Sequence, residues 1–181
     1  MQIKIHHVKI YLLGYMASGK SRFGKELAEK IRYDFHDLDD VFEERFRISI
    51  LDFFDKYGEL NFRRIEENLL HETEQLDHTV ISTGGGTPCY YQNMDFILKN
   101  GTSIYIRQDI HSLIERLKNI RKKRPLLKDV PTNKLESFVN EQVRDREKFY
   151  LKADYTIDGA GITIDKILTI LPPLKLGSGN S

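Results

Sequence analysis

Apolar residues along the chain follow two different periods, and their alternation predicts the fold class. Short apolar, β-rich runs alternate with longer segments in which apolar residues recur at helical spacing, as in Ile110, Leu113 and Leu117. The predicted strands are Val8–Leu13, Tyr33–His36, Thr79–Ser82, Ser103–Ile106 and Tyr155–Ile157. The predicted helices are Lys20–Arg32, Asp40–Phe46, Ile50–Tyr57, Leu60–Leu76, Tyr91–Lys99, Ile110–Ile120, Asn133–Leu151 and Thr163–Leu171. This alternation predicts an α/β domain of three layers, with a five-stranded parallel sheet between helices on both faces.

The stretch between the first predicted strand and helix carries the clearest motif. Residues 14–21 read Gly-Tyr-Met-Ala-Ser-Gly-Lys-Ser and match G-x-x-x-x-G-K-[ST], the phosphate-binding loop. In this motif, glycines let backbone N–H groups surround phosphate oxygens, and the helix N-terminus adds its positive dipole end. We therefore expect Lys20 to reach the β- and γ-phosphates of a nucleoside triphosphate and Ser21 to bind Mg²⁺. A chance glycine turn is the alternative, and the flanking strand and helix argue against it.

Length and composition restrict the class of protein. A chain of 181 residues is expected to form one domain, at 1–171, followed by a flexible tail at 172–181. The net charge of +1 excludes a strong overall field that would attract nucleic acid or an anionic membrane. The single cysteine, Cys89, excludes an intramolecular disulfide and suits a reducing compartment. Because neither a signal peptide nor a membrane-spanning run is evident, we expect a cytoplasmic protein, and we expect a monomer.

Three carboxylates follow the second predicted strand, in the segment Asp37-Leu38-Asp39-Asp40. Ligands of open α/β sheets bind at the carboxyl ends of the strands, so this cluster is predicted to lie beside the phosphate-binding loop. One carboxylate can serve the metal ion, directly or through water, and another can accept the hydrogen bond and the proton of an attacking hydroxyl. The alternative, capping of the following helix, would account for one of the three acids.

The third strand ends in Gly84-Gly85-Gly86, and several arginines lie on predicted helices. Consecutive glycines after a strand indicate the close approach of a ligand to bare backbone, with a simple turn as the alternative. Guanidinium groups bind carboxylates through two parallel hydrogen bonds, so an acidic substrate would need one or two of them. The candidates, each with a surface ion pair as its alternative, are Arg63, Arg64, Arg144 and Arg146.

Several of these segments occur together, in an order and spacing shared with a known family. They are Gly14–Ser21, Asp37–Asp39, Phe62–Glu66, Gly84–Gly86, Arg124–Leu127 and Arg146. In these segments, and over about residues 8–171, the chain resembles the shikimate kinase family. The resemblance implies a P-loop kinase fold with a substrate-binding region at about 39–76. It also implies that the basic, proline-containing stretch within about 119–133 is a mobile lid, where composition alone permits a solvated loop.

The resemblance implies transfer of the ATP γ-phosphoryl group to the 3-hydroxyl of shikimate, on the route to chorismate and the aromatic amino acids. By the same resemblance Lys20, Asp39 and Arg124 would be catalytic, and Ser21 and Asp37 would serve Mg²⁺. The nucleotide would be bound by Gly14, Ala17, Ser18, Gly19, Lys20, Ser21, Arg22, Arg116 and Arg124. Shikimate would be bound by Asp39, Arg63, Gly84, Gly85, Gly86 and Arg146. Ala17 departs from the family, in which glycine is common at that position.

Two other functions are compatible with a phosphate-binding loop. A kinase of another small polyol acid, such as gluconate, would share Lys20 and Ser21 but would give no reason for F-R-R-x-E together with Gly84–Gly86. A nucleotide-binding module without catalysis would not need Asp39 and Arg124, which are both present. Nucleic-acid binding is disfavoured, because the basic stretch is short and lacks interleaved aromatic residues.

Overall fold

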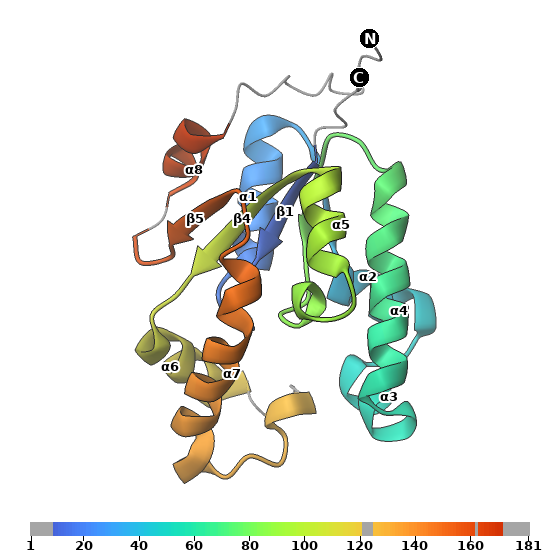
Figure 1. Cartoon of the computed structure of the whole chain (residues 1–181), viewed down its shortest axis with the longest axis vertical. Helices are drawn as coiled ribbons and strands as arrows, with labels where there is room; N and C mark the ends of the chain where they lie inside the picture. Colours follow the sequence, from blue (N-terminus) through green and yellow to red (C-terminus); the bar gives the residue numbers. More distant parts are fainter. Residues whose placement is uncertain (1–8, 121–124, 162, 172–181) are drawn as a thin grey trace.

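The computed structural model describes residues 9–120, 125–161 and 163–171, and Figure 1 shows their arrangement. Among them the strands are β1 (Lys9–Leu13), β2 (Asp34–Asp37), β3 (Thr79–Ser82), β4 (Thr102–Arg107) and β5 (Tyr155–Asp158). The strand order is β2-β3-β1-β4-β5, and every neighbouring pair is parallel. The predicted five-stranded parallel sheet is therefore confirmed. The predictions for Val8, Arg124 and the tail at 172–181 fall outside the described residues.

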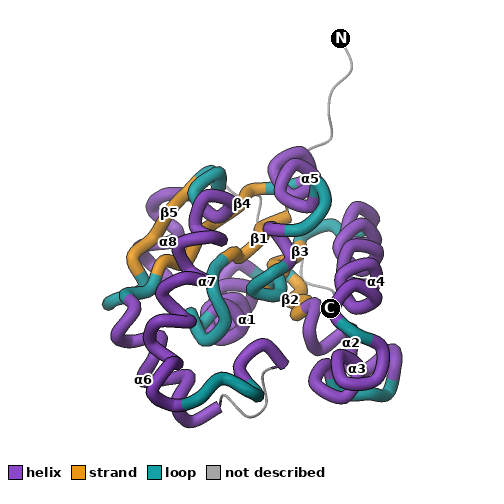
Figure 2. The backbone as a smooth tube through the Cα atoms, turned by 60° about the horizontal axis from the view of Figure 1, so that its bottom comes forward, coloured by secondary structure: helices purple, strands orange, loops and turns teal. Residues whose placement is uncertain are grey.

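Helices and short 3₁₀ turns connect these strands. The helices are α1 (Lys20–Ile31), α2 (Leu38–Phe46), α3 (Ile50–Tyr57), α4 (Glu59–Glu72), α5 (Asn93–Asn100), α6 (Ile110–Ile120), α7 (Leu135–Tyr150) and α8 (Ile164–Ile170). The 3₁₀ turns are η1 (Thr73–Gln75), η2 (Thr87–Cys89), η4 (Pro125–Leu127) and η5 (Thr132–Lys134). In Figure 2 the strands lie in the middle of the molecule, with helices around them. None of the helices in the described ranges has the length and apolarity that crossing a membrane requires.

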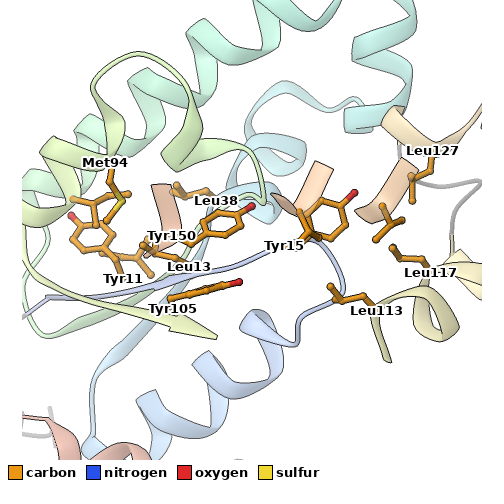
Figure 3. Close-up of a cluster of buried hydrophobic side chains, with 14 of the residues drawn as sticks. Tyr11, Leu13, Tyr15, Leu38, Met94, Tyr105, Leu113, Leu117, Leu127 and Tyr150 are labelled. Carbon is orange, nitrogen blue, oxygen red and sulfur yellow. The ribbon is translucent and has the colours of Figure 1, made fainter. Parts of the chain in front are cut away.

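Alternate residues of the central strand serve two separate cores. Ile10 and Leu12 of β1 pack with buried residues of α1 and α8, whereas Tyr11 and Leu13 pack with residues of α4, α5, α6 and α7. This two-sided burial is why parallel strands read as nearly continuous apolar runs. Helices therefore cover both faces, as predicted. On the second face the rings of Tyr105 and Tyr150 lie 5.1 Å apart, and Figure 3 shows them beside Leu13.

A third cluster holds α2, α3 and α4 together on one side of the molecule (Figure 1). Its centre is Phe42, whose ring lies 5.1 Å from that of Phe53 and 5.0 Å from that of Phe62. Both pairs have the edge-to-face geometry that aromatic rings favour. This aromatic cluster is distinct from the two sheet cores, although Leu38 of α2 and Leu70 of α4 also belong to one of those cores and so attach the three helices to the sheet.

The boundaries of several predicted elements shift, and for the following helices the structure shows how. The helix predicted to start at Asp40 starts at Leu38, because the side chain of Asp37 caps it and accepts a hydrogen bond from Asp39 N at 3.0 Å. Leu38 itself is buried in the core between α-helices and sheet. The helix predicted at Leu60–Leu76 ends as α4 at Glu72 and continues as the 3₁₀ turn η1. The helix predicted from Tyr91 begins at Asn93, because Tyr91 has a φ of 50° and interrupts the helical backbone.

Candidate active site

The phosphate-binding loop joins β1 to α1 at the middle of the sheet. Its backbone is left-handed at Gly14 (φ 146°), Ala17 (φ 63°) and Gly19 (φ 98°). A side chain at Gly14 would place a Cβ 2.7 Å from the carbonyl oxygen of Ile106, so that position requires glycine. Ala17 adopts a conformation that glycine takes more easily, which explains why glycine is common there in the family that the sequence resembles.

Lys20 is buried and folds back over this loop. Its Nζ donates hydrogen bonds to the carbonyl oxygens of Gly14 at 2.9 Å and Tyr15 at 3.0 Å. The ammonium group is therefore held at the loop whose backbone N–H groups would surround a phosphate. Ser18 is also buried, and its Oγ has no partner within the described part of the chain.

Ser21 and Asp37, the two residues predicted to serve Mg²⁺, lie in contact with each other. Ser21 Oγ donates to Asp37 Oδ2 at 2.5 Å, although the two residues come from α1 and β2. Asp37 also caps α2 through its other oxygen, so the capping alternative is correct for this acid and does not exclude the metal role. Within the described ranges no group of three acidic, His or Cys residues could hold a metal by itself. A hydroxyl and one carboxylate suit Mg²⁺, which keeps water and phosphate oxygens as its remaining ligands.

Two adjoining cavities lie at the carboxyl edge of the sheet. The first has a volume of about 450 Å³ and the second about 360 Å³. Residues proposed for the nucleotide line the first, including Ala17, Gly19, Lys20, Ser21, Arg22 and Arg116. Residues proposed for the acceptor line the second, including Asp39, Arg63, Gly84, Gly85, Gly86 and Arg146. The lining shared by both consists of Met16, Ser21, Asp37, Asp39 and Gly85. The two cavities thus meet at the carboxylates and at the hydroxyl of Ser21.

The structure distinguishes between the candidate arginines. Arg63 and Arg146 are buried and line the second cavity, whereas Arg64 and Arg144 are exposed. Arg63 forms ion pairs with Glu66 at 2.8 Å and with Glu59 at 2.9 Å. Burial by itself would lower the pKa of the Arg63 guanidinium, but the charge of Glu66 and the hydrogen bonds outweigh it and raise this pKa. Arg63 therefore forms ion pairs, as the alternative expected, but it lies in the lining of the second cavity and not on the surface.

Arg146 differs from Arg63 in its partners. Its guanidinium lies over the ring of Tyr15, 5.5 Å from the ring centroid. Among the described residues no carboxylate forms an ion pair with it, although its side chain is only 7% exposed. Burial raises the pKa of Tyr15 to about 12, and Arg146 lowers it only in part, so this neighbour is uncharged at neutral pH. A buried cation without a carboxylate is costly unless an anion binds beside it.

The sequence and the fold of this chain are similar to those of known proteins. The profile of the shikimate kinase family matches residues 16–171. The chain belongs to the shikimate kinase family. A shikimate kinase from Azobacteroides pseudotrichonymphae is 40% identical over 166 residues, which cover 91% of this chain and 98% of that protein. A crystal structure of a shikimate kinase from Bacteroides thetaiotaomicron has a TM-score of 0.81 at 35% identity, covering 90% of this chain and 94% of that one.

A further shikimate kinase structure, from Acinetobacter baumannii in complex with shikimate, has a TM-score of 0.84 at 30% identity. The alignment covers 90% of this chain and 92% of that one. These agreements confirm the P-loop kinase fold that the sequence resemblance implied.

Within this shikimate kinase fold, the glycine triplet makes room for charged side chains. A Cβ at Gly84 would lie 2.5 Å from Glu66 Oε1 and 3.1 Å from Asp39 Oδ1. A Cβ at Gly86 would lie 2.6 Å from Arg63 Nη1. A side chain at either position would displace a carboxylate or a guanidinium that α4 places against the loop. This is a reason for glycine beyond the turn and the ligand contact considered from sequence.

Glu66 and Tyr150 contribute to the site, although the sequence analysis assigned neither a role and named Glu66 only as the last residue of F-R-R-x-E. Glu66 is buried and accepts hydrogen bonds from Arg63 Nη1 at 2.8 Å and Thr87 Oγ1 at 2.6 Å. Tyr150 donates its hydroxyl proton to the carbonyl oxygen of Gly85 and so links α7 to the glycine triplet. A signal existed for Glu66, because this carboxylate interrupts the apolar stripe that α4 turns toward the core.

The remaining nucleotide-side residues are placed as follows. Arg116 lies on α6, and its Nη1 donates to the carbonyl oxygen of Ala17 at 3.0 Å, which ties α6 to the loop. Arg22 is exposed and forms a 3.9 Å ion pair with Glu26. Arg124 lies outside the described residues, while Pro125 and Leu126 of η4 line the second cavity.

Proposed function

We propose that this chain transfers the γ-phosphoryl group of ATP to the 3-hydroxyl of shikimate, giving shikimate 3-phosphate and ADP. The observation that carries the proposal is the buried Arg146, which has no carboxylate partner among the described residues and lies in a cavity that adjoins the phosphate-binding loop. An acceptor bearing a carboxylate would supply the missing anion. The family's name and the shikimate complex of the relative from Acinetobacter baumannii support shikimate as this acceptor.

Phosphoryl transfer requires mainly positioning and stabilisation of charge. In the proposed complex the ATP phosphates lie in the first cavity, against Lys20 and the loop N–H groups. Shikimate lies in the second, with its carboxylate between Arg63 and Arg146. Asp39, at the junction, accepts the hydrogen bond of the 3-hydroxyl and then its proton. As the bond from that oxygen to the γ-phosphorus forms, the bond from phosphorus to the β–γ bridging oxygen breaks, and ADP leaves.

The oxygen donors of Ser21 and Asp37 fit a hard cation, and we assign Mg²⁺ to them, directly or through water. When bound, Mg²⁺ neutralises charge that develops on the phosphate oxygens. Lys20 supplies positive charge from the loop, and its buried position makes that charge more effective than it would be in water.

Other parts of this proposal concern domain organisation. We assign one domain to residues 1–171, with acceptor binding in about 39–76 and a lid at about 119–133. The aromatic cluster of α2–α4 supports the assignment of the acceptor-binding region. The position of Pro125 and Leu126 in the lining of the second cavity supports the assignment of the lid. Arg124 is assigned to the phosphates through the family resemblance alone. A monomeric state and a cytoplasmic location remain predictions.

The test is ADP release from Mg-ATP with shikimate, with gluconate and with no acceptor. We expect release with shikimate only. Release with gluconate alone would show that the acceptor is another polyol acid, and ATP binding without any release would indicate a non-catalytic nucleotide-binding module.

The paired variants Arg146→Ala and Arg144→Ala then test the carboxylate contact. The first should raise KM for shikimate and leave KM for ATP nearly unchanged, whereas the exposed Arg144 should be neutral for both.

A further inference from the structure

Tyr90 lies directly behind the arginine that we assign to the acceptor carboxylate. It follows η2, a few residues after the glycine triplet, and its ring lies 4.4 Å from the Arg63 guanidinium carbon. Its hydroxyl donates to Glu59 Oε1 at 2.8 Å. Tyr90 and Glu59 are not among the residues that line the second cavity, so neither is placed to touch the acceptor itself.

One carboxylate oxygen joins these three side chains. Glu59 Oε1 accepts from Tyr90, from Arg63 Nε at 3.1 Å and from Arg63 Nη2 at 2.9 Å. Glu59 thereby occupies the guanidinium edge formed by Nε and Nη2. Burial raises the pKa of the Tyr90 hydroxyl, and its hydrogen bond to Glu59 raises it further, so Tyr90 keeps the proton that it donates at neutral pH.

The hydrogen bonds of Arg63 leave a defined part of the guanidinium for a ligand. A guanidinium has five N–H donors. Glu59 takes two of them, and Glu66 takes one from Nη1. Across the described residues the other two, one on each terminal nitrogen, have no acceptor, and Arg63 lines the second cavity. Terminal nitrogens of one guanidinium bind a carboxylate through two parallel hydrogen bonds when the fork is held in the right orientation.

We propose that Tyr90 is a positioning residue for acceptor recognition, which holds Glu59 and the guanidinium plane so that the terminal nitrogens of Arg63 face the acceptor carboxylate. The inference rests on the proposed function, because it takes that carboxylate as the ligand of Arg63. Without the Tyr90 hydroxyl, Glu59 loses a hydrogen-bond donor that is independent of Arg63. Glu59 is about one-third exposed and would then sample other rotamers, and the guanidinium would rotate with it.

The test compares Tyr90→Phe with Tyr91→Phe. The first removes the hydroxyl and keeps the ring over Arg63, and the second makes the same change at the exposed neighbouring tyrosine. We expect Tyr90→Phe to raise KM for shikimate about three- to tenfold, the effect of losing one ordinary hydrogen bond, because the hydroxyl acts on the acceptor only through Glu59 and Arg63. Its kcat and KM for ATP should stay near those of the wild type, and Tyr91→Phe should match the wild type throughout.

A second arm repeats Tyr90→Phe in an Arg63→Ala background. A residue that acts through Arg63 should have little further effect on KM for shikimate there, whereas a purely structural role would persist. An unchanged KM for shikimate in Tyr90→Phe would overturn the inference, and so would a lower KM, which would show that Glu59 competes with the acceptor. Shikimate turnover by the wild type would still uphold the proposed function in either case. Absence of shikimate turnover in the wild type would overturn both.

Discussion

The substitution Gly86→Ala tests the link between the glycine triplet and Arg63 with a single methyl group. The Gly86 backbone has φ −95° and ψ −19°, a conformation that alanine adopts without strain. The new Cβ would nevertheless lie 2.6 Å from Arg63 Nη1 and 2.7 Å from both Cζ and Nη2. The perturbation is therefore steric, and it acts on the guanidinium.

The size of the effect follows from these distances. Ordinary van der Waals contact at such a Cβ begins at 3.4 Å, so the guanidinium must move by about 1 Å. Glu59 and Glu66 bind its nitrogens through three ion-pair hydrogen bonds, which such a move would strain. A displacement of about 1 Å in a positioning group lowers kcat/KM by about 100-fold, which corresponds to about 2.7 kcal/mol.

The assay is acceptor-dependent ADP release at varied shikimate and at varied ATP, together with thermal unfolding. We expect the loss to appear mainly in KM for shikimate, with KM for ATP unchanged. The free energy of unfolding should fall only modestly, since alanine in an accessible backbone conformation stabilises by about 0.4–1 kcal/mol, which offsets part of the clash. In an Arg63→Ala background the same substitution should cost less than about threefold. A full 100-fold loss in that background would refute the reasoning, because Gly86 would then act on the substrate without Arg63.

Three further outcomes are expected. Lys20→Ala should lower kcat by at least about 100-fold through loss of phosphate charge stabilisation, and near-normal turnover would contradict that role. Asp37→Asn should raise the Mg²⁺ concentration needed for half-maximal rate, and an unchanged Mg²⁺ titration would remove Asp37 from the metal site. Glu66→Gln should lower the free energy of unfolding by about 1–3 kcal/mol in urea titrations, because buried Arg63 loses the charge of Glu66 and keeps only that of Glu59. The partly buried Glu67 lies outside this network, so Glu67→Gln should be near neutral.

The phosphate-binding loop and the order of the layers could be predicted from the sequence because they depend on local order in the chain. The strand, glycine loop and helix around Gly14–Ser21 are contiguous, and apolar runs such as that in β1 show a strand buried on both faces. Helix starts were less accurate: Asp37 caps α2 with its own side chain, which shifted the start from Asp40 to Leu38.

Motif order, through the family resemblance, selected Arg63 and Arg146 over Arg64 and Arg144, which the residues alone could not separate. On a helix Arg63 and Arg64 point about 100° apart, and Arg144 and Arg146, two positions apart, point about 200° apart. Only the packing of α4 and α7 therefore decides which guanidinium is buried. The structure placed the selected pair in one cavity.

What tertiary structure alone decided is the set of partners around these groups. Tyr90 and Glu59 are 31 positions apart, and Tyr150 and Gly85 are 65 apart. No local pattern encodes such contacts, because a hydroxyl or a carboxylate reads the same in sequence whether it faces solvent or a buried guanidinium. Consecutive residues therefore determine the chemistry of the phosphate-binding loop. The orientation of Arg63, which we assign to the acceptor, depends instead on how α4 packs against the glycine triplet.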